Sequence, residues 1–178
     1  MRAVHVFVAF VLCSFSTSTF GSEASGWDKV GIKAGVAVER KVMPDSPLFA
    51  FRGEGVFDVE IERLISVLRN PSIAVEWVDL MTEHTVLKQV DPNTNLIYES
   101  YGLPWPISDR DYLMHEQYNY DDETKVFTIR YKSVEDGLKP VQDNHVRAMA
   151  YRTFWRLTML EAAKTRVEVE VFTDPKGT

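Results

Sequence analysis

Cysteine is almost absent from this sequence. Cys13 is the only one among 178 residues, and it lies within the apolar stretch from Ala3 to Phe15. A single cysteine cannot form an intramolecular disulfide, and it provides no paired thiols that could hold a metal ion. The fold is therefore expected to depend on its hydrophobic core alone.

The motifs of common metal, nucleotide and hydrolase sites are also missing. His84, His115 and His145 are scattered, without the close spacing that metal-binding histidines show. No Gly-x-Ser-x-Gly sequence marks a hydrolase serine, and Gly53-Glu54-Gly55 lacks the third glycine of a dinucleotide-binding loop. We expect no metal ion, no cofactor and no catalytic nucleophile, and we interpret Ser108 as a turn residue.

Positive charge is in deficit. The chain has 20 lysines and arginines against 26 aspartates and glutamates, which gives a formal net charge of −6 at pH 7. Proteins that bind nucleic acids or anionic membranes unaided usually have the opposite balance, because these partners are negatively charged. We therefore expect no nucleic-acid partner. The length is that of one domain, and no internal repeat or low-complexity tract divides it.

Long hydrophobic runs are absent except at the N-terminus. Arg2 precedes the apolar run from Ala3 to Phe15, and residues 16–21 are mostly small and polar. A membrane-spanning helix needs about 20 apolar residues, whereas this layout is typical of a secretory signal. We predict that residues 1–22 are a signal peptide and that the protein is exported, to a periplasm or to the medium. An uncleaved anchor is the alternative.

The clearest predicted element is a helix after Asp58, which we expect to be its N-cap. Its apolar residues recur at the spacing of one helix face, and they are Ile61, Leu64, Ile65 and Leu68. Residues 72–80 predict a shorter helix. Before these helices, residues 33–42 and 49–55 alternate in polarity and predict strands.

The second half of the chain predicts antiparallel strands separated by turns. The strands expected are residues 85–90, 96–102, 111–118, 126–134, 146–160 and 166–173. In the last of them Val167, Val169 and Val171 share one face, while charged residues occupy the other. This alternation favours a sheet with an apolar inner face and a solvated outer face.

One segment carries a family resemblance. Residues 103–112, Leu-Pro-Trp-Pro-Ile-Ser-Asp-Arg-Asp-Tyr, resemble the signature of START domains, the lipid-transfer module named after the steroidogenic acute regulatory protein. Further matches follow in the family's order, including Trp27, Glu76-Trp77 and the run from Arg166 to Gly177. The charged residues of the signature, Arg110 and Asp111, are expected to be buried and paired with each other.

The resemblance implies an α+β helix-grip fold, as in Bet v 1-like proteins, with a curved antiparallel sheet around a long helix and an internal apolar cavity. Residues 27–178 would form a START-like lipid-binding domain. Family members continue into a long C-terminal helix, which this sequence lacks. We expect either that the sequence is a fragment, the interpretation we favour, or that a partner covers the open sheet.

The resemblance also suggests ligand-binding residues. Arg110, Tyr112, Met114 and Glu116 share one face of the signature strand, and the family places that face in the cavity. Glu116 stands where family members often have a basic residue paired with the acid that Glu76 matches. Two buried carboxylates would need a proton or a cation between them, and Arg147 is the preferred cation. The alternative places Glu116 in solvent.

The remaining candidates are mostly aromatic. Met149, Tyr151 and Trp155 share the parity of Arg147 along one strand. Tyr98 precedes the signature and Trp105 lies within it, and they could line a cavity or belong to a packed core.

The predicted function is the binding and transfer of a lipid or another apolar small molecule by a monomer, with transient membrane contact during transfer. The expected class is therefore not an enzyme. The alternatives are a helix-grip cyclase or hydrolase, in which Glu116 would perform acid/base chemistry, and an interaction module that transfers nothing.

Overall fold

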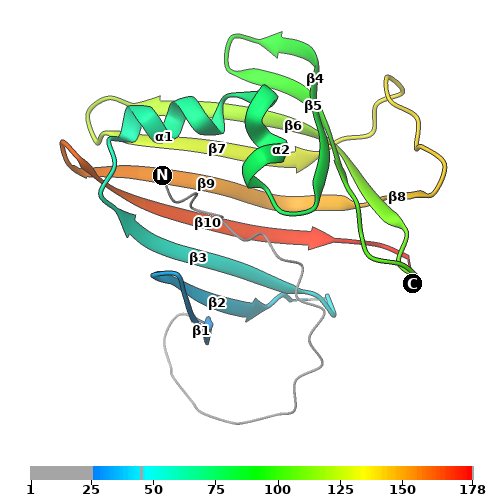
Figure 1. The fold of residues 1–178 in the computed structure, drawn as a ribbon, viewed down its shortest axis with the longest axis horizontal. Helices are drawn as coiled ribbons and strands as arrows, with labels where there is room; N and C mark the ends of the chain where they lie inside the picture. The colour runs from blue at the N-terminus through cyan, green and yellow to red at the C-terminus, as the bar shows by residue number, and fades with distance from the viewer. Residues whose placement is uncertain (1–25, 45, 178) are drawn as a thin grey trace.

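The computed structural model describes residues 26–44 and 46–177. The predicted signal peptide, residues 1–22, lies outside the described residues. The described chain forms one sheet with the strand order β1-β2-β3-β10-β9-β7-β6-β5-β4, and β8 joins it beside β6 (Figure 1). The strands are β1 Asp28–Lys33, β2 Val36–Val42, β3 Phe49–Phe57, β4 Met81–Asp91, β5 Thr94–Tyr101, β6 Asp109–Asp121, β7 Val126–Ser133, β8 His145–Arg147, β9 Met149–Glu161 and β10 Lys164–Asp174.

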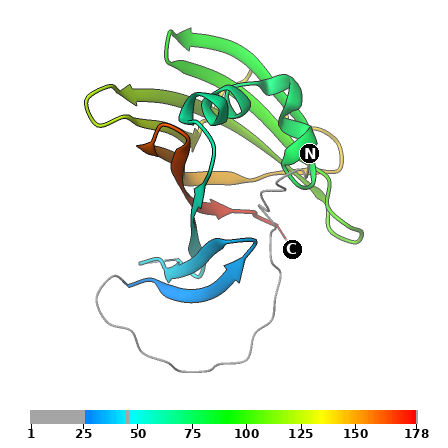
Figure 2. The same ribbon diagram turned by 60° about the vertical axis from the view of Figure 1, so that its left-hand side comes forward.

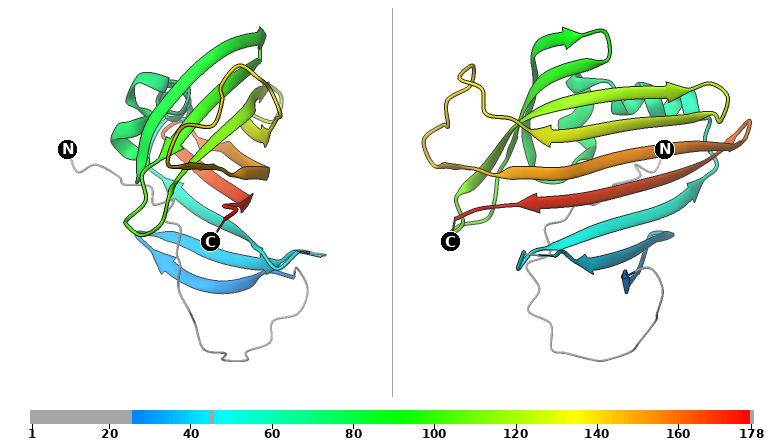
Figure 3. Two further views of the ribbon diagram at one scale, coloured as in Figure 1. Left: turned by 90° about the vertical axis from the view of Figure 1, so that its right-hand side faces the viewer. Right: turned by 180° about the vertical axis from the view of Figure 1, so that it is seen from behind.

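The sheet curves around a short helical segment. This segment comprises α1 Ile61–Leu68, the single 3-10 turn η1 Pro71–Ile73 and α2 Ala74–Trp77. Figures 2 and 3 show the helices on the concave side of the sheet, between the β4–β5 hairpin and the middle strands. The helix-grip architecture expected from the sequence is confirmed.

Helix α1 is held by its apolar face. Ile61 is almost fully buried, and the predicted partners Leu64, Ile65 and Leu68 pack with it against Phe127, Ile129, Trp155 and Leu157 of β7 and β9. The predicted cap is wrong, since Glu60 is the N-cap residue and makes no side-chain capping bond. The core therefore determines where α1 lies, and capping by Asp58 plays no part.

Several element boundaries differ from the predicted ones. The single strand predicted over residues 33–42 is interrupted near its start, because Ala34 and Gly35 adopt φ angles of 51° and 82° and turn the chain between β1 and β2. The second helix ends at Trp77, and β4 begins at Met81, four residues before its predicted start. Val78 is already extended, with φ −92° and ψ 114°, and so ends the helix.

A β-bulge interrupts β9. In the pairing of β9 with β10, Phe172 lies opposite Arg152 but the next residue, Thr173, lies opposite Ala150. Tyr151 is therefore the extra residue, and the alternation of side chains changes phase there. Ala150 faces the inside of the sheet before the bulge, whereas Thr153 and Trp155 face it afterwards.

The charged residues of the signature are buried, as expected, but they are not paired with each other. The guanidinium of Arg110 donates to the backbone carbonyls of Ser108, Pro175 and Lys176, so it joins the start of β6 to the residues after β10. Asp111 points to the outer face and accepts two hydrogen bonds from Arg147 instead. Neighbouring strand residues point to opposite faces, which explains why the mutual pairing fails.

Candidate functional site

A cavity of about 100 Å³ lies between the helical segment and the inner face of the sheet. Leu68 and residues of α2 close one side, and strands β4, β5, β6, β7, β9 and β10 form the rest. Its lining is Leu68, Ala74, Trp77, Val78, Met81, His84, Glu99, Tyr101, Tyr112, Met114, Tyr131, Ala150, Thr153, Trp155, Val169, Val171 and Thr173. The cavity is therefore mostly apolar and aromatic, with a small number of polar groups.

Strand register brings the polar residues of the lining together. Glu99 on β5 lies opposite Tyr112 on β6, and Thr153 on β9 lies opposite Tyr131 on β7. Aromatic rings pack at right angles nearby, with centroids 5.7 Å apart for Tyr101 and Tyr112. Edge-to-face packing of this kind fixes ring positions. The polar groups are therefore held by the sheet itself.

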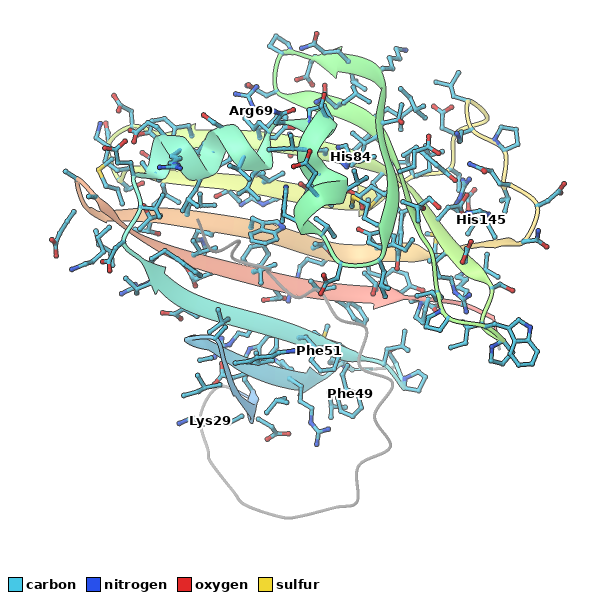
Figure 4. The ribbon with its side chains drawn as sticks, viewed as in Figure 1. Lys29, Phe49, Phe51, Arg69, His84 and His145 are labelled. Carbon is cyan, nitrogen blue, oxygen red and sulfur yellow. The ribbon has the colours of Figure 1, made fainter. Side chains whose placement is uncertain are left out.

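One ion pair lies within the lining. His84 Nδ1 and Glu99 Oε1 are 3.1 Å apart, and the Tyr101 hydroxyl donates to Glu99 Oε2 at 2.8 Å. The side chains of His84 and Glu99 are only 9% and 11% exposed. Burial lowers the pKa of His84, but the hydrogen bond to Glu99 and the charges of Glu99 and Glu116 act oppositely, and the net pKa is raised. Figure 4 shows His84 beside α2.

Three polar atoms of the lining have no hydrogen-bond partner among the described residues. They are Trp77 Nε1, Tyr112 Oη and Thr153 Oγ1, and all three are shielded from solvent. Burial raises the pKa of Tyr112, and the nearby side chain of Thr173 offsets part of this rise, but no hydrogen bond of normal geometry joins the two residues. Buried polar groups are almost always hydrogen-bonded in native proteins. Three exceptions in one cavity indicate a place where another molecule supplies the partner.

Glu116 is buried next to the cavity but does not line it. The residue is 1% exposed, so the solvated alternative is wrong. Its carboxylate accepts hydrogen bonds from Tyr131 and Asn95, both at 3.2 Å, and a further one from Tyr118. These donors carry no charge. The buried carboxylate is therefore stabilised by two hydroxyl groups and an amide, without the cation that the sequence suggested.

The predicted partners of Glu116 lie elsewhere. Glu76 is exposed on α2 and does not line the cavity. Arg147 is on the outer face of the sheet, where it binds Asp111. The hypothesis of a Glu76–Glu116 pair bridged by Arg147 is therefore wrong. The acid that lines the cavity is Glu99.

Some of the other predicted site residues line the cavity, and the rest lie outside it. Tyr112, Met114 and Trp155 line the cavity. Trp105 is 92% exposed, Tyr151 is 44% exposed at the bulge, and Met149 lies on the outer side with Arg147. The guanidinium of Arg110 donates its hydrogen bonds to backbone carbonyls, as described above, and does not line the cavity.

Tyr98 is fully buried, but on the outer face of β5. Its hydroxyl accepts from Gln142 at 2.8 Å, and Lys139 lies 4.1 Å from the ring centroid. On the same face, Ser100 Oγ is 2.9 Å from Nε2 of His145, which Figure 4 labels beside the loop that precedes β8. These contacts attach residues 139–145 to the sheet, and they lie outside the cavity.

Sequence reasoning missed His84, Glu99 and Thr153 as lining residues. The alternation of residues in β5 could have indicated Glu99, because Ile97, Glu99 and Tyr101 share one face of a predicted strand. For β9 the signal was misleading, because the bulge at Tyr151 reverses the parity between Arg147 and Trp155.

The described residues contain no group of three or more His, Cys, Asp or Glu side chains arranged to hold a metal ion. None of the helices within residues 26–44 and 46–177 has the length and apolar character needed to cross a bilayer.

Comparison with known proteins agrees with this architecture. Human STARD10 superposes with a TM-score of 0.80 and is 23% identical, over 88% of this chain and 64% of that one. The chain thus spans just under two thirds of the length of this human protein. A STAR-related lipid transfer protein from Xanthomonas axonopodis superposes with a TM-score of 0.73 and is 26% identical, over 86% of this chain and 84% of that one.

Sequence comparison extends the similarity. An uncharacterized protein of Pseudomonas aeruginosa is 22% identical over 154 residues, which are 86% of this chain and 75% of that protein. The family model described as START domain matches residues 16–178, a span that includes every residue described by the structure. With the signature leading into β6 and the helix-grip sheet around its cavity, this chain belongs to the START domain family.

Proposed function

We propose that this protein binds a lipid-like molecule, with an apolar body and a small polar group, in the cavity beneath α1 and α2, and that it transfers this molecule between membranes. The observation that carries the proposal is the coincidence of an apolar lining with three unpartnered polar atoms in one cavity. Pockets for small ligands typically combine these two properties. The lipid transfer named in the Xanthomonas relative's description supports the same assignment.

The energetics favour a ligand that is mostly hydrocarbon. Each methylene group that leaves water for the cavity stabilises the complex by about 0.8 kcal/mol. The present volume of about 100 Å³ is smaller than that of most ligand pockets, so a long chain must displace side chains as it enters. Met81 and Met114 are suited to this adjustment, because unbranched thioether side chains repack easily.

Export forms part of the proposal. It rests on Arg2, the apolar run and the small residues near Gly21. N-terminal sequencing of the protein from its native cell should find a start between Ser22 and Ser25. A product that begins at Met1 would contradict it.

The proposal is tested by extracting purified full-length protein with organic solvent and identifying the extract by mass spectrometry. One apolar or amphipathic molecule per chain is the expected result, and vesicle assays should show protein-dependent movement of a fluorescent phospholipid. The variant Ala150→Leu fills part of the cavity and should reduce both signals. Ala162→Leu, in the exposed β9–β10 turn, is the matched control. Extracts without ligand and no transfer by the wild type would contradict the proposal.

A further inference from the structure

The unpartnered atoms limit the chemistry of the bound group. The indole Nε1 of Trp77 can only donate a hydrogen bond, so its missing partner must be an acceptor. The hydroxyls of Tyr112 and Thr153 donate equally well to the same kind of atom. An ammonium group has donors only and cannot satisfy Trp77. The cavity therefore requires an atom with a free lone pair, such as an oxygen.

The charges around the cavity further limit the chemistry of the bound group. No lysine or arginine is found among the described residues that line it, and its charged members are Glu99 and His84. His84 is already paired with Glu99, and the buried carboxylate of Glu116 is near enough to act on His84. An anionic group placed here would meet two carboxylates and no free cation. Desolvating an anion without a counter-charge is costly.

Neighbouring polar groups of the lining already have partners. Both oxygens of Glu99 accept hydrogen bonds within the protein, from His84 and Tyr101. The hydroxyl of Tyr131 donates to Glu116 at 3.2 Å. Trp77, Tyr112 and Thr153 are thus distinguished from neighbours of similar chemistry by their lack of a partner.

From these contacts, and resting on the proposed function, we infer that the cavity selects ligands whose polar end is an uncharged oxygen, a hydroxyl or a carbonyl. Trp77, Tyr112 and Thr153 are the residues that determine this specificity. Carboxylates, phosphates and protonated amines are rejected, the first two because of their negative charge and the last because an ammonium group has no hydrogen-bond acceptor.

The test uses full-length protein and five probes with six carbons each. These are hexane, hexan-1-ol, hexan-2-one, hexylamine and hexanoate, with dissociation constants measured by NMR titration at pH 7. One good hydrogen bond is worth up to roughly tenfold in affinity. Hexan-1-ol and hexan-2-one should bind roughly tenfold more tightly than hexane, and hexylamine and hexanoate should bind more weakly than hexan-1-ol.

Two substitutions remove an unpartnered hydroxyl with little change of shape. Tyr112→Phe and Thr153→Val should each weaken hexan-1-ol roughly threefold to tenfold while leaving hexane unchanged. Tyr131→Phe is the control, because it removes a hydroxyl from the same cavity that is already bonded. Tyr131→Phe should preserve the ratio of the hexan-1-ol affinity to the hexane affinity. Without ligand, Tyr112→Phe should melt no lower than the wild type, whereas Tyr131→Phe should melt lower.

The outcomes separate the inference from the proposed function. If none of the probes binds, the cavity is not a ligand site and the proposed function fails with it. If hexane binds as tightly as hexan-1-ol, water satisfies the three atoms and the inference is overturned, while apolar binding stands. Tighter binding of hexanoate or hexylamine than of hexan-1-ol would overturn the inference in the same way.

Discussion

Arg147 donates two hydrogen bonds to the carboxylate of Asp111, from Nε at 2.8 Å and from Nη2 at 3.1 Å. Asp111 has no exposed side-chain surface, whereas 22% of the Arg147 side chain is exposed. The arginine also donates to the backbone carbonyl of Lys139 at 3.0 Å. This bidentate pair therefore connects β6, β8 and the loop before β8 on the outer face of the sheet.

Removal of Arg147 should destabilise the fold strongly, because it leaves a buried carboxylate without its counter-charge. We expect Arg147→Met to lower the free energy of unfolding by about 3–5 kcal/mol in urea denaturation. Arg156→Met removes a surface partner that lies 3.6 Å from Glu168, and it should cost less than about 1 kcal/mol. Equal losses in the two variants would show that the Asp111 pair contributes no more than a surface ion pair.

His84 should make stability depend on pH near neutrality. Its pKa is raised in the folded state, so the folded protein retains a proton that the unfolded chain releases. The stabilisation is complete below the unfolded pKa of about 6.5 and is lost as pH rises through the folded value.

The His84 imidazole signals in an NMR titration should have their midpoint above about 6.5. Melting curves between pH 5.5 and 8 should show a decline with pH that His84→Gln reduces. His115→Gln, on the exposed face of β6, should leave the decline unchanged. A midpoint below 6.5 would mean that desolvation outweighs Glu99.

Gly55 should resist replacement because of close packing. A Cβ atom at this position would lie 3.1 Å from Phe57 Cε2 and 3.3 Å from Val36 Cγ2. Overpacking of this kind typically costs about 1–3 kcal/mol, so Gly55→Ala should lower the thermal midpoint. Gly31 is also in a strand, but a Cβ atom there would meet nothing within 4 Å beyond its chain neighbours, and Gly31→Ala should be close to neutral. Equal effects would show that the neighbours of Gly55 move aside easily.

Replacement of Glu116 by glutamine should be destabilising even though the shape is kept. The carboxylate accepts from Tyr118, Tyr131 and Asn95, and an amide offers only one accepting oxygen. Hydrogen bonds to a charged group contribute about 1.5–3 kcal/mol each, and we expect Glu116→Gln to cost about this much in chemical denaturation. Glu168→Gln on the outer face of β10 serves as control. A neutral effect would show that these three hydrogen bonds contribute little to stability.

Much of the fold could be predicted because its signals are local. The i, i+3, i+4, i+7 spacing from Ile61 to Leu68 and the alternation of valines in β10 each depend on one element only. The signature before Tyr112 then indicated which sheet these elements form. The β1–β2 turn was missed, because a positive φ at Ala34 is not signalled by that residue type.

The site was less predictable because it depends on register between strands. Tyr112 and Met114 were placed correctly, since they share the face of the signature strand. Glu99 was missed because its position opposite Tyr112 depends on how residues 102–108 connect the two strands, and loop geometry does not follow from polarity. Glu76 was matched by its place in the sequence, but α2 ends at Trp77 and leaves that side chain in solvent.

The extra residue in β9 has a consequence for the charge of the cavity. Downstream of Tyr151 the strand is fixed by β7 and β10, which hold Trp155 opposite Ile129 and Val169. A strand that kept Tyr151 but paired without the bulge would alternate in one phase throughout and turn Arg147 and Met149 inward, in place of Ala148 and Ala150. The guanidinium of Arg147 would then leave Asp111 and face the cavity. The bulge therefore keeps the positive charge of Arg147 out of the cavity lining.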